Sequence, residues 1–239
     1  DGAMLAVASG GDINVASGGE IDIASGATLD VNGTIDLTGA TKTGFPTSGL
    51  VALRIYTSTT TWEKATNDPT KIIVEVIAAA GGSGAGAGRG GSGGAGAYAK
   101  VFLDVSTVTT ATATVGAAGA AGASGAGGAG GDSKFTYATG SGSFTEVECI
   151  GGNGGGHANH TGGSGTAVPT GPANGIYVAG NGGGGASNSG NTAHGYGASQ
   201  HGGYTYNYAT GYGSANAGTD SATTGRAGMP GLVLVWEYL

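Results

Sequence analysis

Charge is scarce in this sequence. Its 239 residues include 8 Lys and Arg and 15 Asp and Glu, so that 10% of the chain is charged, against about 25% in an ordinary soluble domain. The formal net charge is -7, whereas binding to nucleic acid relies on clustered Lys and Arg that neutralise phosphates. We therefore expect no nucleic-acid partner.

Cysteine, proline and long apolar runs are equally sparse. Cys149 is the one cysteine in the sequence, which excludes a disulfide within the chain and a Cys-x-x-Cys metal site. The 5 prolines are too few for a collagen triple helix. No stretch approaches the roughly 18 apolar residues of a membrane-spanning helix, so we expect no membrane insertion. The N-terminus lacks a signal-peptide pattern, and we interpret the chain as part of a longer protein.

Glycine is what the sequence has in excess, with 56 residues, where about 7% of a chain is usual. Such a chain carries few large side chains, so hydrophobic burial has to be supplemented by dense backbone hydrogen bonding or by oligomerisation. A conventional enzyme core is excluded on this ground, and we expect no enzymatic activity.

The first 40 residues contain a repeat with a period of eight. The segments ASGGDINV, ASGGEIDI and ASGATLDV follow one another at residues 8–15, 16–23 and 24–31. In each segment two aliphatic residues flank one other residue, which is the alternation of a half-buried β-strand. Because eight is a multiple of two, every repeat returns its aliphatic pair to the same face.

Residues 1–40 are therefore predicted to form a short-period β-helical shaft. A single chain of this length would complete only one or two coils, fewer than the roughly three repeats that a solenoid needs. Three chains winding together would close each layer, so a homotrimer is the preferred interpretation, ahead of a single-chain stack or a strand added to a partner. Short-period β repeats of this kind resemble the shafts of phage tail fibres.

The rest of the chain alternates β-type segments with glycine tracts, and no segment has a helical stripe. Residues 41–80 are expected to be a linker followed by the first strands. The pattern of aliphatic and aromatic residues predicts strands at residues 50–56, 71–77, 98–105, 110–115, 133–137, 144–150 and 232–239. We expect the last of these strands to pair with the first ones.

Glycine tracts lie between these strands, at residues 81–96, 116–131, 151–156, 180–185 and 225–231. The second tract has glycine at every third position from Gly116 to Gly131, and three residues per turn is the period of the extended polyproline-II type of helix. Glycine on one face lets backbones approach closely enough to bond to one another. Residues 81–239 are thus predicted to be a bundle of polyglycine-II helices within an all-β fold.

The order of these segments resembles the glycine-rich domain at the C-terminal tips of phage tail fibres. An aliphatic strand runs into Ala-Ala-Ala-Gly-Gly at 78–82, and Gly-Gly-Asp-Ser follows at 130–133 and Gly-Gly-Asn-Gly-Gly at 151–155. The likeness extends from about residue 47 to the C-terminus. It implies a receptor-binding protein at the distal end of a virion tail fibre, joined to upstream fibre or tail proteins.

The sequence is also similar to the glycine-rich adhesins of T-even-like phages, whose polyglycine-II bundle carries variable receptor-binding loops. Those adhesins are separate chains seated on a trimeric fibre. Here the shaft-like repeat and the tip share one chain, which favours a fused, trimeric tip.

Aromatic and imidazole side chains gather between residues 156 and 213, where charge is almost absent. Loops that mix tyrosine with Ser, Gly and Asn are typical of antibody-type binding surfaces, because tyrosine provides rigid contact area with a polar tip. We expect these loops to bind a bacterial surface polysaccharide or an outer-membrane protein; the alternative is that the tyrosines only pack over the thin bundle. The predicted receptor-binding residues are His157, His160, Tyr177, His194, Tyr196, His201, Tyr204, Tyr206, Asn207, Tyr208 and Tyr212.

Other chemistry finds little support in the sequence. His157 and His160 have a spacing that metal ligands use, but no Asp, Glu or Cys lies near them in sequence, and we expect no metal. Gly-x-Gly-x-x-Gly matches arise from composition alone and lack the strand-to-helix context of a dinucleotide site, so no cofactor is expected. No Gly-x-Ser-x-Gly elbow lies between a strand and a helix.

Two other functions share this composition. Flat polyglycine-II bundles with regular small side chains also occur in ice-binding proteins, and glycine-rich chains also build structural or assembly proteins. The irregular tyrosine-rich loops and the eight-residue repeat favour the tail-fibre tip over both.

Overall fold

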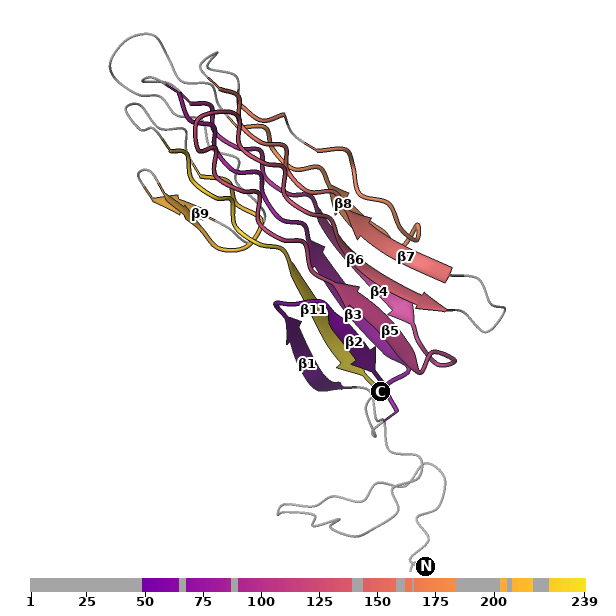
Figure 1. Cartoon of the computed structure of the whole chain (residues 1–239). Coiled ribbons are helices and arrows are strands. Elements are labelled where there is room, and N and C mark those ends of the chain that lie inside the picture. Colours follow the sequence, from indigo (N-terminus) through magenta and orange to yellow (C-terminus); the bar gives the residue numbers. More distant parts are fainter. Residues whose placement is uncertain are drawn as a thin grey trace, which may run out of the picture. The chain divides into compact units, whose positions relative to one another are not determined.

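A computed structural model describes residues 49–64, 68–86, 90–138, 144–157, 162–164, 166–183, 203–205, 208–216 and 224–239, all within the unit Thr47–Leu239 (Figure 1). These residues form strands, turns and extended tracts and contain no helix, which confirms the all-β prediction. In the part of the chain that is described, no helix is long and apolar enough to cross a membrane. The shaft predicted at residues 1–40 and the linker after it lie outside the described residues.

Five strands form one antiparallel sheet in the order β1, β11, β3, β4, β8. They are β1 (Leu50–Tyr56), β11 (Leu232–Tyr238), β3 (Lys71–Ile77), β4 (Tyr98–Asp104) and β8 (Gly175–Val178). The C-terminal strand lies between β1 and β3, where Trp236 pairs with Leu53 on one side and with Ile73 on the other. This confirms the prediction that the last strand pairs with the first ones.

A second antiparallel sheet has the order β2, β5, β6, β7. It consists of β2 (Thr60–Glu63), β5 (Thr110–Thr114), β6 (Ser133–Ala138) and β7 (Phe144–Cys149), while β9 (Gly203–Thr205) and β10 (Tyr208–Thr210) form a separate hairpin. The sequence pattern predicts seven of these strands to within one residue at each end. It misses β2, β8, β9 and β10, which have four residues or fewer and are too short to show a period.

The hydrophobic core lies between the two sheets. Ile72, Val74 and Val76 of β3 point into it and are fully buried, together with Trp62 of β2 and Phe135 of β6. The two rings meet edge to face with their centroids 6.1 Å apart, an arrangement that ring quadrupoles favour. Each such side chain contributes about 1.5–3 kcal/mol through burial, so the strand part of this glycine-rich chain is stabilised by an ordinary apolar core.

Cys149 lies at the end of β7 inside the same core, as a small buried residue. Its Sγ donates to the carbonyl oxygen of Val76 across a distance of 3.2 Å. Burial raises the pKa of the thiol far above its usual 9.0. The reactive thiolate is therefore strongly disfavoured, and Cys149 has a structural role.

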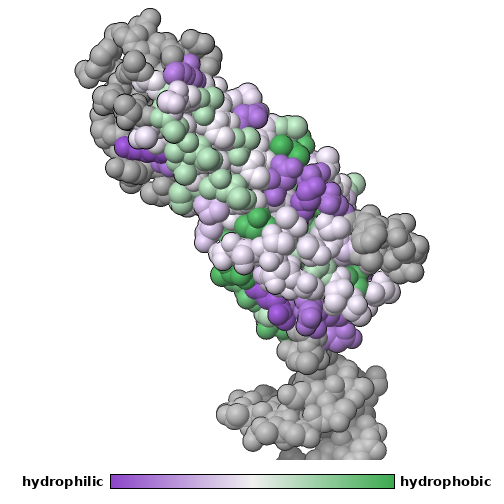
Figure 2. Space-filling view, viewed as in Figure 1, coloured by the Kyte–Doolittle hydropathy of each residue, from purple (hydrophilic) through white to green (hydrophobic). Residues whose placement is uncertain are grey.

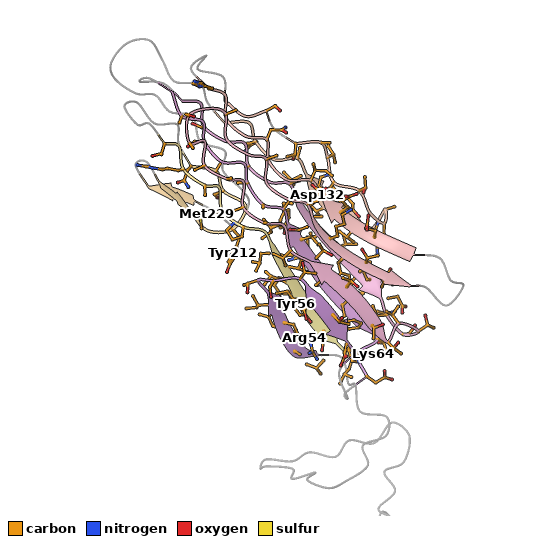
Figure 3. The ribbon with its side chains drawn as sticks, viewed as in Figure 1. Arg54, Tyr56, Lys64, Asp132, Tyr212 and Met229 are labelled. Atoms are coloured by element: carbon orange, nitrogen blue, oxygen red, sulfur yellow. The ribbon has the colours of Figure 1, made fainter. Side chains whose placement is uncertain are left out.

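A buried carboxylate joins the two sheets at one side of the core. Glu237 of β11 is completely buried, and its Oε1 accepts hydrogen bonds from Arg54 Nε and from Trp62 Nε1, each at 2.6 Å. Its Oε2 accepts no hydrogen bond from a described residue. The bond to the carboxylate raises the pKa of Arg54, which lies beside Tyr56 on β1 (Figure 3). Glu237 thus ties the edge strand β1 and the strand β2 to the interior.

Glycine-rich tracts continue directly from the ends of the strands (Figure 1). The central tract, residues 78–86, follows β3 and is buried throughout. Asp132 and Ser133 lie where the tracts join the second sheet. Asp132 Oδ1 accepts a hydrogen bond from the N–H of Gly151 at 2.9 Å, and Ser133 Oγ accepts one from Gly116 at 3.0 Å. The Gly-Gly-Asp-Ser motif therefore fixes the start of two tracts.

The backbone of the central tract repeats every three residues. Its N–H groups donate to three neighbouring tracts in turn, across distances of 2.8–3.1 Å. Donors three positions apart bond to the same neighbouring tract. Residues 78, 81 and 84 donate to 97, 94 and 91; residues 79, 82 and 85 donate to 131, 128 and 125; and residues 80 and 83 donate to 229 and 226. Successive residues therefore face different neighbours, about a third of a turn apart.

Two further tracts donate hydrogen bonds to the carbonyl groups of the central tract. Gly119 and Gly122 donate to Ala80 and Ser83, while Gly152 and Gly155 donate to residues 79 and 82. The central tract is consequently surrounded by five others. Neighbouring backbones replace water as hydrogen-bond partners here, which is what burial of a backbone without helix or sheet requires.

Glycine is necessary where two tracts meet. A Cβ added to Gly81, Gly82 or Gly84 would come closer than 3.0 Å to a backbone carbonyl of a neighbouring tract, a separation that real Cβ atoms do not reach. Ala80 and Ala85 occupy other positions of the same tract and are fully buried without such a conflict. The close approach of backbones thus decides which positions are glycine.

Candidate functional site

The end of the tracts away from the strands brings together residues that are far apart in the sequence. Backbone hydrogen bonds of 2.6–2.9 Å close this end. They run from Ala85 to Gly125, from Gly91 to Gly156 and from Gly225 to Gly122. These six residues define the distal end of the tracts. Four of the segments outside the described residues, 87–89, 158–161, 184–202 and 217–223, follow tracts that run from the strands toward this end.

His157 is a predicted receptor-binding residue that the structure places at the distal end. It follows directly on Gly156, and its side chain is exposed. The ring atom Nδ1 lies 3.1 Å from the carbonyl oxygen of Ala85. This contact holds the imidazole against the end of the central tract, so a binding surface there would include it.

The predicted residues Tyr204 and Tyr208 belong to the β9–β10 hairpin. In its register Tyr204 pairs with Ala209, and Tyr208 pairs with Thr205. Two positions lie between these paired strands, which is the commonest connection length in hairpins. Those two positions are the predicted Tyr206 and Asn207, which lie outside the described residues.

The segment after the hairpin is bound to two tracts. Gly211 and Gly213 have φ angles of 85° and 70°, in the left-handed region that favours glycine. Gly213 donates its N–H to Pro230 at 2.9 Å and accepts one from Gly96 at 3.0 Å, and Met229 donates to Ser214 at 3.1 Å. The half-buried Tyr212 lies in this segment, near Met229 (Figure 3). The C-terminal end of the hairpin is therefore fixed to the tracts.

Tyr177 lies away from the distal end, on β8. It pairs with Ala99 of β4 and packs against the core, and its hydroxyl donates to the carbonyl oxygen of Pro172 at 2.5 Å. Burial raises its pKa. This environment agrees with the packing alternative for this tyrosine, whose part in receptor binding stays a prediction.

The other predicted site residues are not placed by the structure. They are His160, His194, Tyr196 and His201, which lie outside the described residues. Their grouping with His157 and with the hairpin stays a prediction.

Comparison with protein families covers both sheets and the tracts. The family model of a glycine-rich domain matches residues 56–233, from the last residue of β1 to the second residue of β11. The chain belongs to this glycine-rich domain family. A comparison with curated proteins finds no match.

The distal part of the glycine-rich domain is almost uncharged. The described residues from 150 onward include two charged ones, Arg226 and the buried Glu237, and the surface over the tracts is mostly pale in Figure 2, as expected for glycine and alanine. No three His, Cys, Asp or Glu residues are grouped as metal ligands in the part of the chain that is described. Such a surface suits binding by shape, ring stacking and neutral hydrogen bonds.

Sequence reasoning missed the residues that anchor the hairpin in the glycine-rich domain. They are Gly211, Gly213 and the buried residues 214–216, where Asn216 Nδ2 also donates to the carbonyl oxygen of Ala227 at 2.5 Å. Their signal is a glycine on either side of Tyr212. That signal is weak in a chain with 56 glycines.

Proposed function

We propose that this chain is the tip of a phage tail fibre, an adhesin that binds a bacterial cell-surface receptor, either a surface polysaccharide or an outer-membrane protein. One observation carries the proposal. A buried central tract, hydrogen-bonded to five others, leads from the sheets to a distal end that carries His157, and a tyrosine-containing hairpin is anchored to the same tracts through Pro230 and Gly96. A rigid support that carries neutral aromatic segments is suited to recognition rather than to catalysis.

The proposal includes a finer account of the fold. The tracts are polyglycine-II helices, an interpretation that the three-residue repeat of hydrogen-bond partners supports. Residues 1–40 form the β-helical shaft, through which three chains associate and join upstream fibre or tail proteins. The chain then stands at the distal end of the fibre on the virion.

Binding in this account is weak at each contact and strong in sum. Tyrosine rings stack on sugar rings or on apolar loop residues, while their hydroxyls and the neighbouring Asn and His side chains form neutral hydrogen bonds. Three chains in one fibre and several fibres on one virion raise the effective concentration of every further contact. Attachment would therefore be reversible for one tip and lasting for the particle.

The test replaces Tyr204, Tyr206 and Tyr208 together by serine. We expect the fluorescently labelled variant to attach at least about tenfold more weakly to Gram-negative cells that bind the unaltered chain, because aromatic anchors dominate such contacts. Attachment is measured by flow cytometry as a function of protein concentration. The matched control is Ala123→Ser with Ala126→Ser. These two exposed residues directly follow Gly122 and Gly125 of the distal end. Equal attachment of all three proteins would contradict the proposal.

Ice binding is a second candidate, favoured by the outer surface of residues 116–131. Exposed alanines recur at every third position on two neighbouring antiparallel tracts, which bond to each other through Gly128 and Gly131. The exposed residues are Ala117, Ala120 and Ala123 on one tract, and Ala126 and Ala129 on the other.

Thermal hysteresis separates the two functions. If the chain is a tail-fibre tip, we expect no gap between the freezing and melting temperatures of a solution of the full chain. A gap that disappears in Ala120→Lys, which places a charge within the alanine rows, would replace the adhesin proposal with ice binding. The Tyr204→Ser, Tyr206→Ser, Tyr208→Ser variant is the control, because it leaves those rows unchanged.

A further inference from the structure

The five-stranded sheet has a second face, opposite the core. Residues that pair across neighbouring strands point to the same side of a sheet, so the registers identify the members of this face. One row runs from Leu53 through Trp236 and Ile73 to Phe102, and the next runs from Ile55 through Leu234, Glu75 and Lys100 to Ile176. We call these nine residues the outer face.

The outer face is apolar and open to solvent at its margins. Leu53, Ile55, Phe102 and Ile176 are 48%, 60%, 46% and 62% exposed. A sheet with one face in water normally alternates apolar and polar residues, whereas strands covered on both sides read as continuous apolar runs. The sequences LVALRIY of β1 and LVLVWEY of β11 are of the second kind. The strands are built to be covered on both faces.

The charges on the outer face are already paired with each other. Lys100 Nζ lies 2.7 Å from Glu75 Oε1 and 5.3 Å from the centre of the Trp236 ring, so one ion pair and one cation–π contact neutralise the middle of the face. At the end of the same strands Lys71 pairs with Asp104, which lowers the pKa of that carboxyl. A partner therefore needs no complementary charge, and two copies of the face do not repel each other.

The size of the outer face matches an interface between proteins. Four strands of seven residues and the four-residue β8, about 4.8 Å apart and at about 3.3 Å per residue, cover roughly 500 Å² in projection, of which the row of Leu232 and Ile77 at one end is already buried. The open part lies within the roughly 300–600 Å² of the largest apolar patch on a typical monomer, a patch that is often functional. It is also of the same order as the roughly 800 Å² that each partner buries in a stable complex.

We propose that the outer face packs against a second copy of this chain. A neutral apolar surface of this size fits another copy of itself, and the edge strand β1 begins at Leu50, three residues after the first residue of the unit Thr47–Leu239. Residues 41–49 connect this strand to residues 1–40, so a shaft that joins copies through residues 1–40, as proposed above, would raise the effective concentration of their outer faces. That the copies number three and that a shaft joins them rests on the proposed function; that the outer face packs against a second copy rests on its apolar, neutral surface.

The fluorescence of Trp236 reports whether the outer face is covered. The second tryptophan of the chain, Trp62, is completely buried in the core, so quenching by acrylamide in solution reports on Trp236. We expect weak quenching in the full-length chain, together with a mass by light scattering of at least twice the 22.4 kDa of one chain.

Lysine substitutions on the outer face test the interface. Ile55→Lys with Phe102→Lys should weaken association by about tenfold or more for each buried charge, and should increase the quenching of Trp236. Val168→Lys is the matched control, because Val168 is 61% exposed and does not belong to the sheet. Circular dichroism checks that each variant is folded.

Every other outcome overturns the proposal. A monomer with protected Trp236 would mean that another part of the same chain covers the outer face. An oligomer with fully quenched Trp236 would mean that the copies associate elsewhere, for example through residues 1–40. Equal effects of the double variant and of Val168→Lys would remove the role of the outer face. Cell attachment by the tyrosine variant is measured separately, so failure of the receptor proposal has a different signature.

Discussion

Gly82→Ala is expected to destabilise the chain by about 3 kcal/mol, which lowers the midpoint of thermal unfolding by roughly 6–12 °C in a unit of this size. The added Cβ would meet the carbonyl of Ala120 and the oxygen of Gly119, both backbone groups of the adjoining tract. Relief requires the two tracts to separate. Gly82 also donates to Gly128 and accepts from Gly155, each at 2.9 Å, so separation weakens several buried hydrogen bonds at once.

The matched control is Gly125→Ala at the distal end. A Cβ at this position has nothing within 4 Å, and the same substitution there should change stability by no more than about 0.5 kcal/mol. Thermal unfolding of both variants is followed by circular dichroism. Similar midpoints for Gly82→Ala and Gly125→Ala would mean that the close packing of tracts does not determine stability.

Arg54→Leu is expected to cost about 2 kcal/mol of unfolding free energy. The substitution leaves the carboxylate of Glu237 inside the core with the hydrogen bond from Trp62 Nε1 at 2.6 Å. Removal of one partner of a fully buried ion pair costs about 3–5 kcal/mol. The value here is lower because the side chain of Arg54 is 36% exposed, and water screens this pair in part.

A second substitution separates the charge effect from lost packing. Glu237→Gln removes the charge but keeps an oxygen that can accept the hydrogen bond from Trp62. Added to Arg54→Leu, it should restore about half of the lost stability, since no buried charge is then left unpaired. Urea unfolding of the two single variants and the double variant measures the coupling. Additive losses would show that the ion pair does not hold β1 in place.

The strands were predictable because their signal is local. The runs at 50–56, 71–77 and 232–238 are long enough to show β-type composition, and Gly49, Pro69 and Gly231 mark their beginnings. The same runs carry apolar residues on both faces. Short strands carry no such signal: β8 is Gly-Ile-Tyr-Val between an Asn and an Ala, and it exists because it pairs with β4.

The arrangement of the tracts could be predicted only in part. The step of three from Gly116 to Gly131 is visible in the sequence, and a three-residue repeat of hydrogen-bond partners is present in the structure. Which tract lies beside which depends on contacts between residues such as Ser83 and Arg226, which no local pattern encodes. The low complexity of the sequence makes this prediction harder, because many registers between tracts of Gly, Ala and Ser are equivalent in sequence until the strands fix the ends of the tracts.

For the candidate site, sequence composition indicated the region but not the individual roles. Tyr177 follows Asn and Gly in the sequence, as the hairpin tyrosines lie among Gly and Asn, yet its strand packs it against the core. His157 lies at the distal end because a tract of set length runs from β7 to that point. The place of each residue in the fold, rather than its type, therefore decides that Tyr177 packs against the core and that His157 lies at the distal end.

Because the hydrogen-bond partners repeat every three residues, a tract can change in length only in steps of three residues. Inserting one residue into the central tract would turn every later N–H by a third of a turn, away from its own neighbour and toward the next one. Inserting three would restore the register and add one turn, provided that the adjoining tracts lengthen equally. The connections between tracts carry no such rule. Mutation can therefore change the connections one residue at a time, whereas the tracts that carry them can change in length only by whole turns of three residues.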